Sequence, residues 1–240
     1  MLAHLYRRLT LLLTALLLAG CVMAPGGPIA TAPTTLPGGT VTRAQFESVS
    51  RRMQPVATQV CRERSPHLIC EFTVILDDRP DRPPNAYHTR DRTGRPVIAF
   101  TESLIRDLRS EDEVALIFGH EAAHHIADHI PRMQREAQTG ALLGGVAAAL
   151  IGADAAMTRE IMTVTAQVGA RRYSKPFELE ADRIGALIAA RAGYDPLRGA
   201  EIFRRIPDPG NQFLGTHPPN AERLQEVERA VARMRAGQPV

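Results

Sequence analysis

Residues 110–124 have the sequence SEDEVALIFGHEAAH, in which a helix start precedes two regularly spaced histidines. Ser110 is a favoured N-cap residue, and Glu113 stands three positions later, as in a capping box. The apolar residues that follow predict a helix from Ser110 to about Ile130, where Pro131 ends the pattern. The rest of the chain is interpreted outward from this helix.

The predicted helix carries the motif HExxH. His120 and His124 are four residues apart, so both imidazoles lie on one helix face and can hold a single Zn²⁺. Glu121 lies beside them, where a carboxylate acts as general base in zinc peptidases. A catalytic zinc needs a third protein ligand. The metzincin solution requires Gly at position 127 and His at 130, and the chain has Ala127 and Ile130, which excludes that class.

Two more histidines follow the motif. His125 and His129 form a second i, i+4 pair, turned about 140° around the helix from the first pair. We interpret both as exposed or helix-end histidines that interact with the helix dipole. The third ligand is therefore expected to be a downstream carboxylate. The candidates are Glu136, Glu160, Glu178, Glu180 and Glu201.

Glu178 stands out because it lies near the start of a second long helix, which Ser174-Lys175-Pro176 opens and Gly193 ends. Asp182 follows at i+4 on the same face, where it can accept the far N–H of a liganding histidine. Glu180 lies about 200° around the helix and is expected to face elsewhere. The alternative is that Glu178 and Glu180 interact only with the positive end of the helix dipole.

Three segments together carry a family resemblance. HEAAH at 120–124, YSKPFELEAD at 173–182 and His217-Pro218 before the final helix resemble the HtpX-like and CAAX-prenyl-endopeptidase-related zinc metallopeptidases. The resemblance covers about residues 85–230 and is strongest to their lipid-anchored periplasmic members. It implies a compact gluzincin-type α+β domain. The membrane-spanning helices of some members and the helical repeats of others have no counterpart in the sequence pattern.

The resemblance also implies residue roles. His120, His124 and Glu178 correspond to the ligands of one Zn²⁺ per chain, Glu121 to the catalytic residue, and Asp182 to the residue that orients a ligand. The implied reaction is metal-assisted hydrolysis of peptide bonds, in which Glu121 takes a proton from water and delivers it to the leaving amine.

The reaction also requires a donor for the developing oxyanion. Tyr173, five residues before Glu178, and His217 are the candidates. His217 has a second possible role as a fourth zinc ligand that holds the site shut until substrate arrives, and a third as a residue that only ties down its proline-rich loop. Val97 to Phe100 resembles the active-site edge strand of the family, to which a substrate would add as a further strand.

The N-terminal residues predict export and lipidation. Residues 1–20 have the arginines and the short apolar stretch of a signal peptide. Leu18-Ala19-Gly20-Cys21 resembles a lipobox, which implies that Cys21 becomes a diacylated N-terminus. The next residue is Val22 rather than Asp, which resembles the sorting pattern for the outer membrane. The alternative is a conventional signal peptide that is cleaved nearby.

The sequence then predicts a linker and a domain. Residues 21–40 contain the lipidated cysteine and a flexible stretch rich in proline and glycine, and residues 41–240 form the metallopeptidase domain. Cys61 and Cys70 are expected to form a disulfide, which would contribute about 2 to 3 kcal/mol to stability. The alternative is two buried free thiols.

The coarse pattern predicts an α+β class, mostly helical with a small sheet. Helices are expected at about 42–54, 101–108, 195–206 and 220–235, and strands at 71–76 and 96–100, with a loop at 77–95. Residues 140–157 are small and apolar but too few to span a bilayer, and predict a buried or mobile helical hairpin. The alternative is that this segment contacts a membrane.

The composition favours some partners over others. The chain has 240 residues and a formal charge of +3, with no tryptophan and 5% aromatic residues, so it lacks the basic and aromatic surface of a nucleic-acid-binding protein. The leading hypothesis is a lipid-anchored periplasmic zinc endopeptidase that hydrolyses misfolded or unassembled envelope proteins. The second is a zinc-stabilised chaperone or adaptor with a shut site. The sequence does not predict an oligomeric state.

Overall fold

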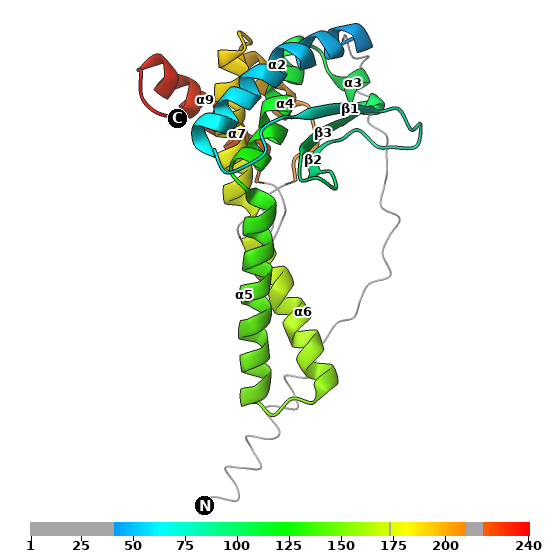
Figure 1. Cartoon of the computed structure of the whole chain (residues 1–240), viewed down its shortest axis with the longest axis vertical. Coiled ribbons are helices and arrows are strands. Elements are labelled where there is room, and N and C mark those ends of the chain that lie inside the picture. The colour runs from blue at the N-terminus through cyan, green and yellow to red at the C-terminus, as the bar shows by residue number, and fades with distance from the viewer. Residues whose placement is uncertain (1–40, 173, 210–217) are drawn as a thin grey trace, which may run out of the picture. The chain divides into compact units, whose positions relative to one another are not determined.

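The structure is a computed structural model and describes residues 41–172, 174–209 and 218–240. The chain divides into two units, Met1–Thr35 and Leu36–Val240, and all described residues belong to the second. The class is α+β, mostly helical with a small sheet, as predicted (Figure 1). In chain order the elements are α2 (Arg43–Arg64), β1 (Thr73–Asp77), β2 (Ala86–Arg90), β3 (Pro96–Thr101), α3 (Glu102–Asp107), α4 (Glu111–Ile126), α5 (His129–Leu150), α6 (Ala155–Arg172), α7 (Ser174–Arg191), α8 (Pro196–Ala200), the 3₁₀ helix η1 (Glu201–Arg204) and α9 (Asn220–Arg235).

Helix α2 is longer than predicted. The expected helix at 42–54 continues through Pro55 to Arg64. Its buried residues recur every three or four positions from Phe46 to Cys61 and pack in the core. Burial of this continuous face outweighs the one backbone hydrogen bond that a proline inside a helix removes.

The sheet corrects two predictions. Its strand order is β1-β3-β2, with β1 parallel and β2 antiparallel to β3. Strand β2 lies inside the segment 77–95, which was predicted to be a loop. The prediction missed this strand because its sequence, AYHTR, lacks the apolar alternation of a typical strand. The expected edge strand, Val97 to Phe100, belongs to β3 and is the middle strand, so β2 forms an edge instead.

Helices α4 and α7 lie in direct backbone contact. A Cβ atom on Gly119 would be 2.5 Å from the Gly185 carbonyl oxygen, and one on Gly185 would be 2.6 Å from the His120 nitrogen. These distances exclude any side chain at either position. The glycine pair therefore brings α7 against the residue that begins the HExxH motif.

Helix α4 begins as predicted, since the Ser110 hydroxyl accepts a hydrogen bond from the Glu113 N–H. It ends at Ile126, however, and not near Ile130. Asp128 then adopts a left-handed conformation with φ of 55°, and α5 starts in a new direction at His129. The apolar pattern does not reveal this break, because only one residue, Asp128, leaves the helical conformation.

Helices α5 and α6 form a hairpin that extends beyond the other elements of this unit (Figure 1). The hairpin predicted within 140–157 is therefore present, but its helices span residues 129–172. Of the two alternatives predicted for it, the buried hairpin is wrong, because most of its large apolar side chains are exposed. Within the described residues, no helix has the length and apolar character needed to cross a bilayer.

The remaining predicted helices are present, and the one expected at 195–206 is divided into α8 and the 3₁₀ helix η1. Helix α7 ends just before Gly193, which has a φ of 83°. Asp195 caps α8 by accepting the Leu197 N–H. Cys61 in the last turn of α2 and Cys70 before β1 are joined by a disulfide, with their Cα atoms 5.7 Å apart.

Candidate metal centre

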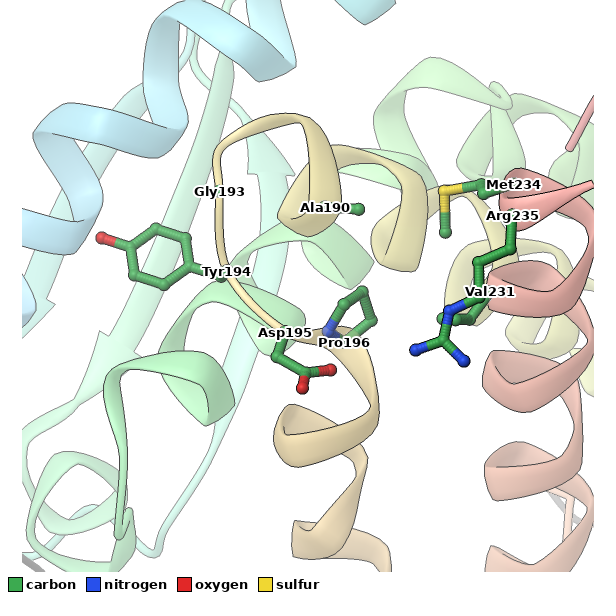
Figure 2. A pocket seen from close by; sticks show the side chains of 8 residues that line it. All are labelled: Ala190, Gly193, Tyr194, Asp195, Pro196, Val231, Met234 and Arg235. Carbon is green, nitrogen blue, oxygen red and sulfur yellow. The ribbon is translucent and has the colours of Figure 1, made fainter. Parts of the chain in front are cut away.

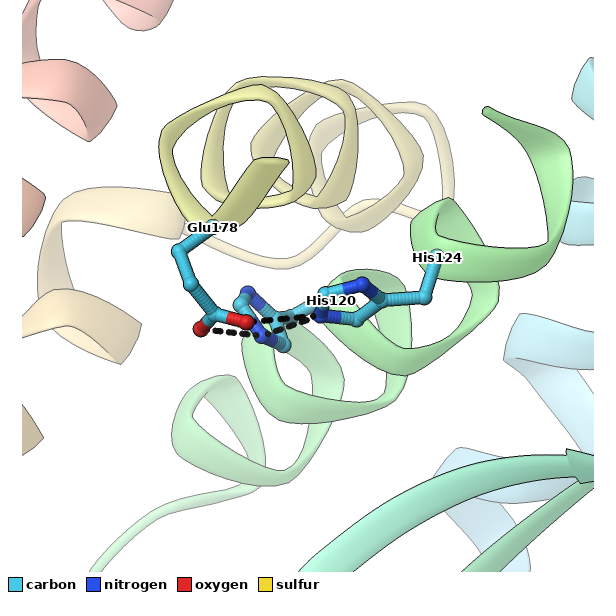
Figure 3. Close-up of side chains that lie close together, drawn as sticks. All are labelled: His120, His124 and Glu178. Atoms are coloured by element: carbon cyan, nitrogen blue, oxygen red, sulfur yellow. Dashed lines mark hydrogen bonds and ion pairs between the residues drawn. The ribbon is translucent and has the colours of Figure 1, made fainter. Parts of the chain in front are cut away.

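Three metal-ligating side chains converge between α4 and α7 (Figure 3). The Nε2 atoms of His120 and His124 are 3.0 Å apart. The Glu178 carboxylate oxygens lie 3.4 Å from His120 Nε2 and 3.3 Å from His124 Nε2. The structure thus brings together the three residues that the sequence singled out.

The spacing of these atoms fits a small tetrahedral cation. Zinc binds histidine nitrogen and carboxylate oxygen at about 2.0 to 2.2 Å, which places two tetrahedral ligands about 3.3 Å apart. The observed separations of 3.0 to 3.4 Å match this value. Three protein ligands leave the fourth position that catalytic zinc sites keep for water or substrate.

His120 is oriented by a buried ion pair. Its Nδ1 atom lies 2.8 Å from an Asp182 carboxylate oxygen, and Asp182 is fully buried. Arg223 of α9 donates to both oxygens of this carboxylate, at 2.7 and 2.8 Å. Asp182 therefore occupies the orienting position expected from its i+4 spacing, and Arg223 holds it there.

His124 is oriented by a second chain of contacts, which the sequence did not predict. Its Nδ1 atom lies 2.9 Å from His129 Nδ1. His129 Nε2 is 3.2 Å from a Glu180 carboxylate oxygen, to which Arg132 also donates at 2.9 Å. The His129 ring stacks on Phe177, with the centroids 4.5 Å apart.

These contacts determine the tautomers. A carboxylate only accepts hydrogen bonds, so His120 Nδ1 and His129 Nε2 donate to their carboxylate partners. His129 Nδ1 must then accept, and His124 Nδ1 donates to it. When both imidazoles are neutral, the Nε2 atoms of His120 and His124 both carry lone pairs, which a cation between them can accept. Without a cation, a proton on His120 can occupy the 3.0 Å between the two Nε2 atoms.

The electrostatics of the centre also favour a cation. Burial lowers the pKa of the His120 imidazole, but Asp182 and Glu178 outweigh burial and raise that pKa to about 10. Burial raises the pKa of the Asp182 carboxyl, yet Arg223 and His120 hold it below its usual range. In the absence of a metal, the carboxylates therefore retain a proton on His120.

The structure corrects the predicted positions of His125 and His129 and gives Glu180 a partner near the metal centre. His125 and His129 are 1% and 3% exposed, so their interpretation as exposed residues is wrong, although His125 lies in the last turn of α4 and His129 begins α5. His125 contacts the Ile69 carbonyl oxygen at 2.8 Å and joins α4 to the segment before β1. Glu180 does diverge from Glu178, but it serves the second histidine through His129.

Glu121 is buried next to His120 and makes no hydrogen bond or ion pair with the described part of the chain. Its carboxylate is therefore available to exchange a proton with a bound water. Tyr173 and His217, the two candidate oxyanion donors, lie outside the described residues, as does Cys21.

A surface pocket lies elsewhere in the fold (Figure 2). It is formed by the end of α7, the start of α8 and the last turns of α9. Its carboxylate, Asp195, is engaged in capping α8. The pocket contains none of the ligand residues or their partners.

Comparison with known proteins agrees with this geometry. Residues 43–231 match Peptidase family M48, which is most of the chain. The chain belongs to Peptidase family M48. The matched region includes both histidines and the glutamate of the centre.

Three curated relatives are similar to this chain. "Mitochondrial metalloendopeptidase OMA1" of Arabidopsis thaliana is 30% identical over 56% of this chain and 27% of its own length. The yeast Saccharomyces cerevisiae protein of the same name is 28% identical over 66% of the chain and 46% of its own length. "Beta-barrel assembly-enhancing protease" of Yersinia pestis is 29% identical over 58% of this chain and 31% of its own length.

The matched region thus spans less than half the length of each of these relatives. No solved structure matches the chain significantly.

Proposed function

We propose that this chain is a zinc-dependent endopeptidase. The observation that carries the proposal is the convergence of two Nε2 atoms and a carboxylate at zinc spacing, beside the Glu121 carboxylate, which makes no hydrogen bond or ion pair with the described residues. Membership of Peptidase family M48 and the names of the metalloendopeptidase relatives support the same activity.

His120, His124 and Glu178 are the proposed ligands of one Zn²⁺. When bound, zinc polarises the scissile carbonyl and lowers the pKa of its water toward 7. Asp182 and His129 keep the two imidazoles in the tautomer that presents Nε2. Together these residues hold the three donor side chains in the orientation that the metal requires.

Glu121 is the proposed general base and acid. Its carboxylate takes a proton from the water whose oxygen attacks the carbonyl carbon, and passes that proton to the amine nitrogen as the C–N bond breaks. Tyr173 or His217 is proposed to donate to the oxyanion, and His217 has the alternative role of fourth ligand.

Strand β2 is the proposed place where substrate adds. It pairs with β3 on one side, and among the described strands none pairs with its other side. Backbone hydrogen bonds to such an edge bind an extended peptide with little demand on its sequence. This replaces the role that the sequence assigned to Val97–Phe100.

We also propose the setting in which the enzyme acts. Residues 1–20 are a signal peptide, Cys21 is lipidated, and residues 22–40 link the lipid to the domain, which places the enzyme in the periplasm at the outer membrane. Its proposed substrates are misfolded or unassembled envelope proteins. The bacterial relatives named beta-barrel assembly-enhancing proteases support this choice.

The test compares wild type with Glu121→Gln in residues 36–240. Zinc per chain is measured by elemental analysis, and cleavage is measured on unfolded casein. We expect one zinc per chain in both proteins and at least a hundredfold loss of cleavage in the variant, because Gln cannot take the proton.

A matched ligand variant completes this test. His124→Ala is expected to lose both zinc and cleavage. Zinc in wild type and Glu121→Gln with no cleavage by either would contradict the peptidase proposal and favour a chaperone or adaptor with a shut site. Absence of stoichiometric zinc from wild type would contradict both.

A further inference from the structure

The α5–α6 hairpin has small residues between its helices. A Cβ atom on Gly140 would be 2.1 Å from the Thr165 carbonyl oxygen, and one on Gly169 would be 2.3 Å from the Glu136 carbonyl oxygen. Gly144 is buried against the same threonine. The two backbones are therefore in contact, and there is no room for a side chain at Gly140, Gly144 or Gly169. Close approach through small residues is typical of helices that pack within lipid.

The large apolar side chains of the hairpin point outward instead. Leu142, Leu143, Val146 and Leu150 of α5 are 69%, 66%, 60% and 82% exposed. In α6, Met157, Val164 and Val168 are 51%, 52% and 40% exposed. A hairpin that folds in water buries such residues between its helices, so this distribution is the reverse of a water-soluble one.

Five of the exposed residues share one side of the hairpin, whereas Leu142 and Val146 lie about 160° from Gly144 around α5 and face away from α6. Each residue is rotated by about 100° from the previous one. Measured from the interface position Gly144, Leu143 and Leu150 lie about 100° to 120° to one side. Helix α6 runs antiparallel to α5, and its interface position is Thr165. Val164 lies about 100° around α6 from Thr165, on the same side of the hairpin as Leu143 and Leu150. Met157 and Val168 lie on that side as well. The hairpin therefore presents one continuous apolar face.

The α5 part of this face has a length and a lack of charge that fit one leaflet of a bilayer, while α6 carries Arg159 and Glu160 between Met157 and Val164. Residues 137–153 carry no charged side chain, and the adjacent charges are Glu136 and Asp154. Residues 140–150 form about 16 Å of helix, roughly half of the ~30 Å hydrocarbon core. This agrees with the finding that none of the described helices is able to cross a membrane.

We propose that the apolar face of the α5–α6 hairpin, formed by Leu143, Leu150, Met157, Val164 and Val168, binds a lipid bilayer surface. The chain before the described domain supports this occupant. Its proposed lipid site, Cys21, is separated from Val41 by a linker that reaches at most about 60 Å at 3.1 Å per residue. A domain held that close to lipid meets the bilayer at high effective concentration.

Such binding has a consequence for the metal centre. The hairpin connects α4, which carries both histidines, directly to α7, which carries Glu178. Lipid bound to the hairpin would hold the centre near the membrane surface, where unassembled membrane proteins present unfolded segments.

The test uses residues 36–240, which contain the whole described core and the disulfide but not Cys21. Binding is measured by flotation with vesicles of phosphatidylethanolamine and phosphatidylglycerol. We expect wild type to float with the vesicles, and Leu143→Gln/Leu150→Gln to bind at least tenfold more weakly. The matched control is Ile75→Gln, which changes a 42% exposed apolar residue of β1 and is expected to bind as wild type.

A fluorescence measurement adds a second readout. The chain has no tryptophan, so Leu143→Trp introduces a single reporter. We expect its emission to shift to the blue with vesicles and to be quenched by brominated acyl chains, whereas Ile75→Trp should show neither effect.

Two results would overturn the proposal. One is a wild-type domain that does not float and a Leu143→Trp emission that vesicles leave unchanged. The other is a stable oligomer in solution that the double glutamine variant converts to a monomer without vesicle binding by either protein, because the face would then contact a second copy of the chain. Neither readout depends on peptidase activity, so the outcome is separate from that of the Glu121→Gln test.

Discussion

At the scale of single residues, the centre depends on partners that fix which nitrogen of each histidine faces the metal. Asp182 accepts the Nδ1–H of His120, and His129 accepts the Nδ1–H of His124. Such partners typically change metal affinity by ten- to a hundredfold when they are removed. The two ligands are thus oriented by different chemistry, a carboxylate in one case and an imidazole in the other.

His129→Phe tests the second of these partners. Phenylalanine retains the stack on Phe177 but leaves the His124 Nδ1–H without an acceptor. We expect zinc affinity, measured by competition with a chromogenic chelator, to fall ten- to a hundredfold.

The control for this prediction is His125→Phe. His125 is equally buried and adjacent to a ligand, but its hydrogen bond goes to the Ile69 carbonyl. Its zinc affinity should equal that of wild type even if its melting temperature falls. An unchanged affinity in His129→Phe would show that the imidazole pair does not position the ligand.

At the scale of elements, the centre requires α4 and α7 to lie unusually close. Gly119 and Gly185 allow this contact, and Glu178 lies two turns before Gly185 on the same helix. The break at Asp128 is equally important, because it turns α5 so that His129 returns over His124. A continuous helix would place His129 about 140° away from His124 around the axis.

Gly185→Ala is expected to separate the two helices. Its Cβ atom would be 2.6 Å from the His120 nitrogen, so the backbones must move apart. We expect a loss of about 1 to 3 kcal/mol in unfolding free energy, measured by urea denaturation, and weaker zinc binding.

Gly145→Ala is the matched control, since it is also a helical glycine but its Cβ atom would have 3.5 Å to the nearest atom, the sulfur of Met162. It should be neutral or slightly stabilising because alanine favours helix. Equal effects of the two substitutions would contradict the role assigned to the close contact.

At the scale of the whole molecule, the metal centre joins distant parts of the chain. Its ligands come from α4 and α7, and Arg223 adds α9 through Asp182. A ligand that binds only the folded state stabilises it, by about 2.7 kcal/mol at a concentration 100 times the dissociation constant. Metal removal should therefore weaken the entire domain.

We expect chelation by EDTA to lower the melting temperature, and added zinc to restore it. The difference in melting temperature between the zinc-bound and the metal-free protein should grow as pH rises from about 6.5. In the metal-free protein the folded-state pKa of His120 is about 10, above the unfolded value. The stability that this proton contributes is present below pH 6.5 and is lost as pH rises through 10.

The measurement is differential scanning calorimetry of both forms between pH 6 and 9. His124→Ala, which lacks a ligand, should melt at the same temperature with and without zinc. If the difference in melting temperature between zinc-bound and metal-free wild type narrows as pH rises, His120 does not carry the stabilising proton assigned to it.

Local spacing was sufficient for much of this protein. HExxH at 120–124 and the i+4 pair Glu178 and Asp182 are patterns within one helix each, and helical periodicity alone places their members on one face. The same periodicity, with its caps, predicted α7, α8, α9 and the α+β class. The structure adds that the two faces meet, through Gly119 and Gly185.

Tertiary structure decided the features that depend on contacts between elements. Arg223 is 41 residues from Asp182, and nothing in the local pattern distinguishes it from the other arginines. Strand β2 has no apolar alternation of its own and is a strand because β3 pairs with it. The hairpin exposes its apolar residues because glycines occupy its interface. Periodicity specifies which residues share a face, whereas the fold as a whole determines what each face contacts.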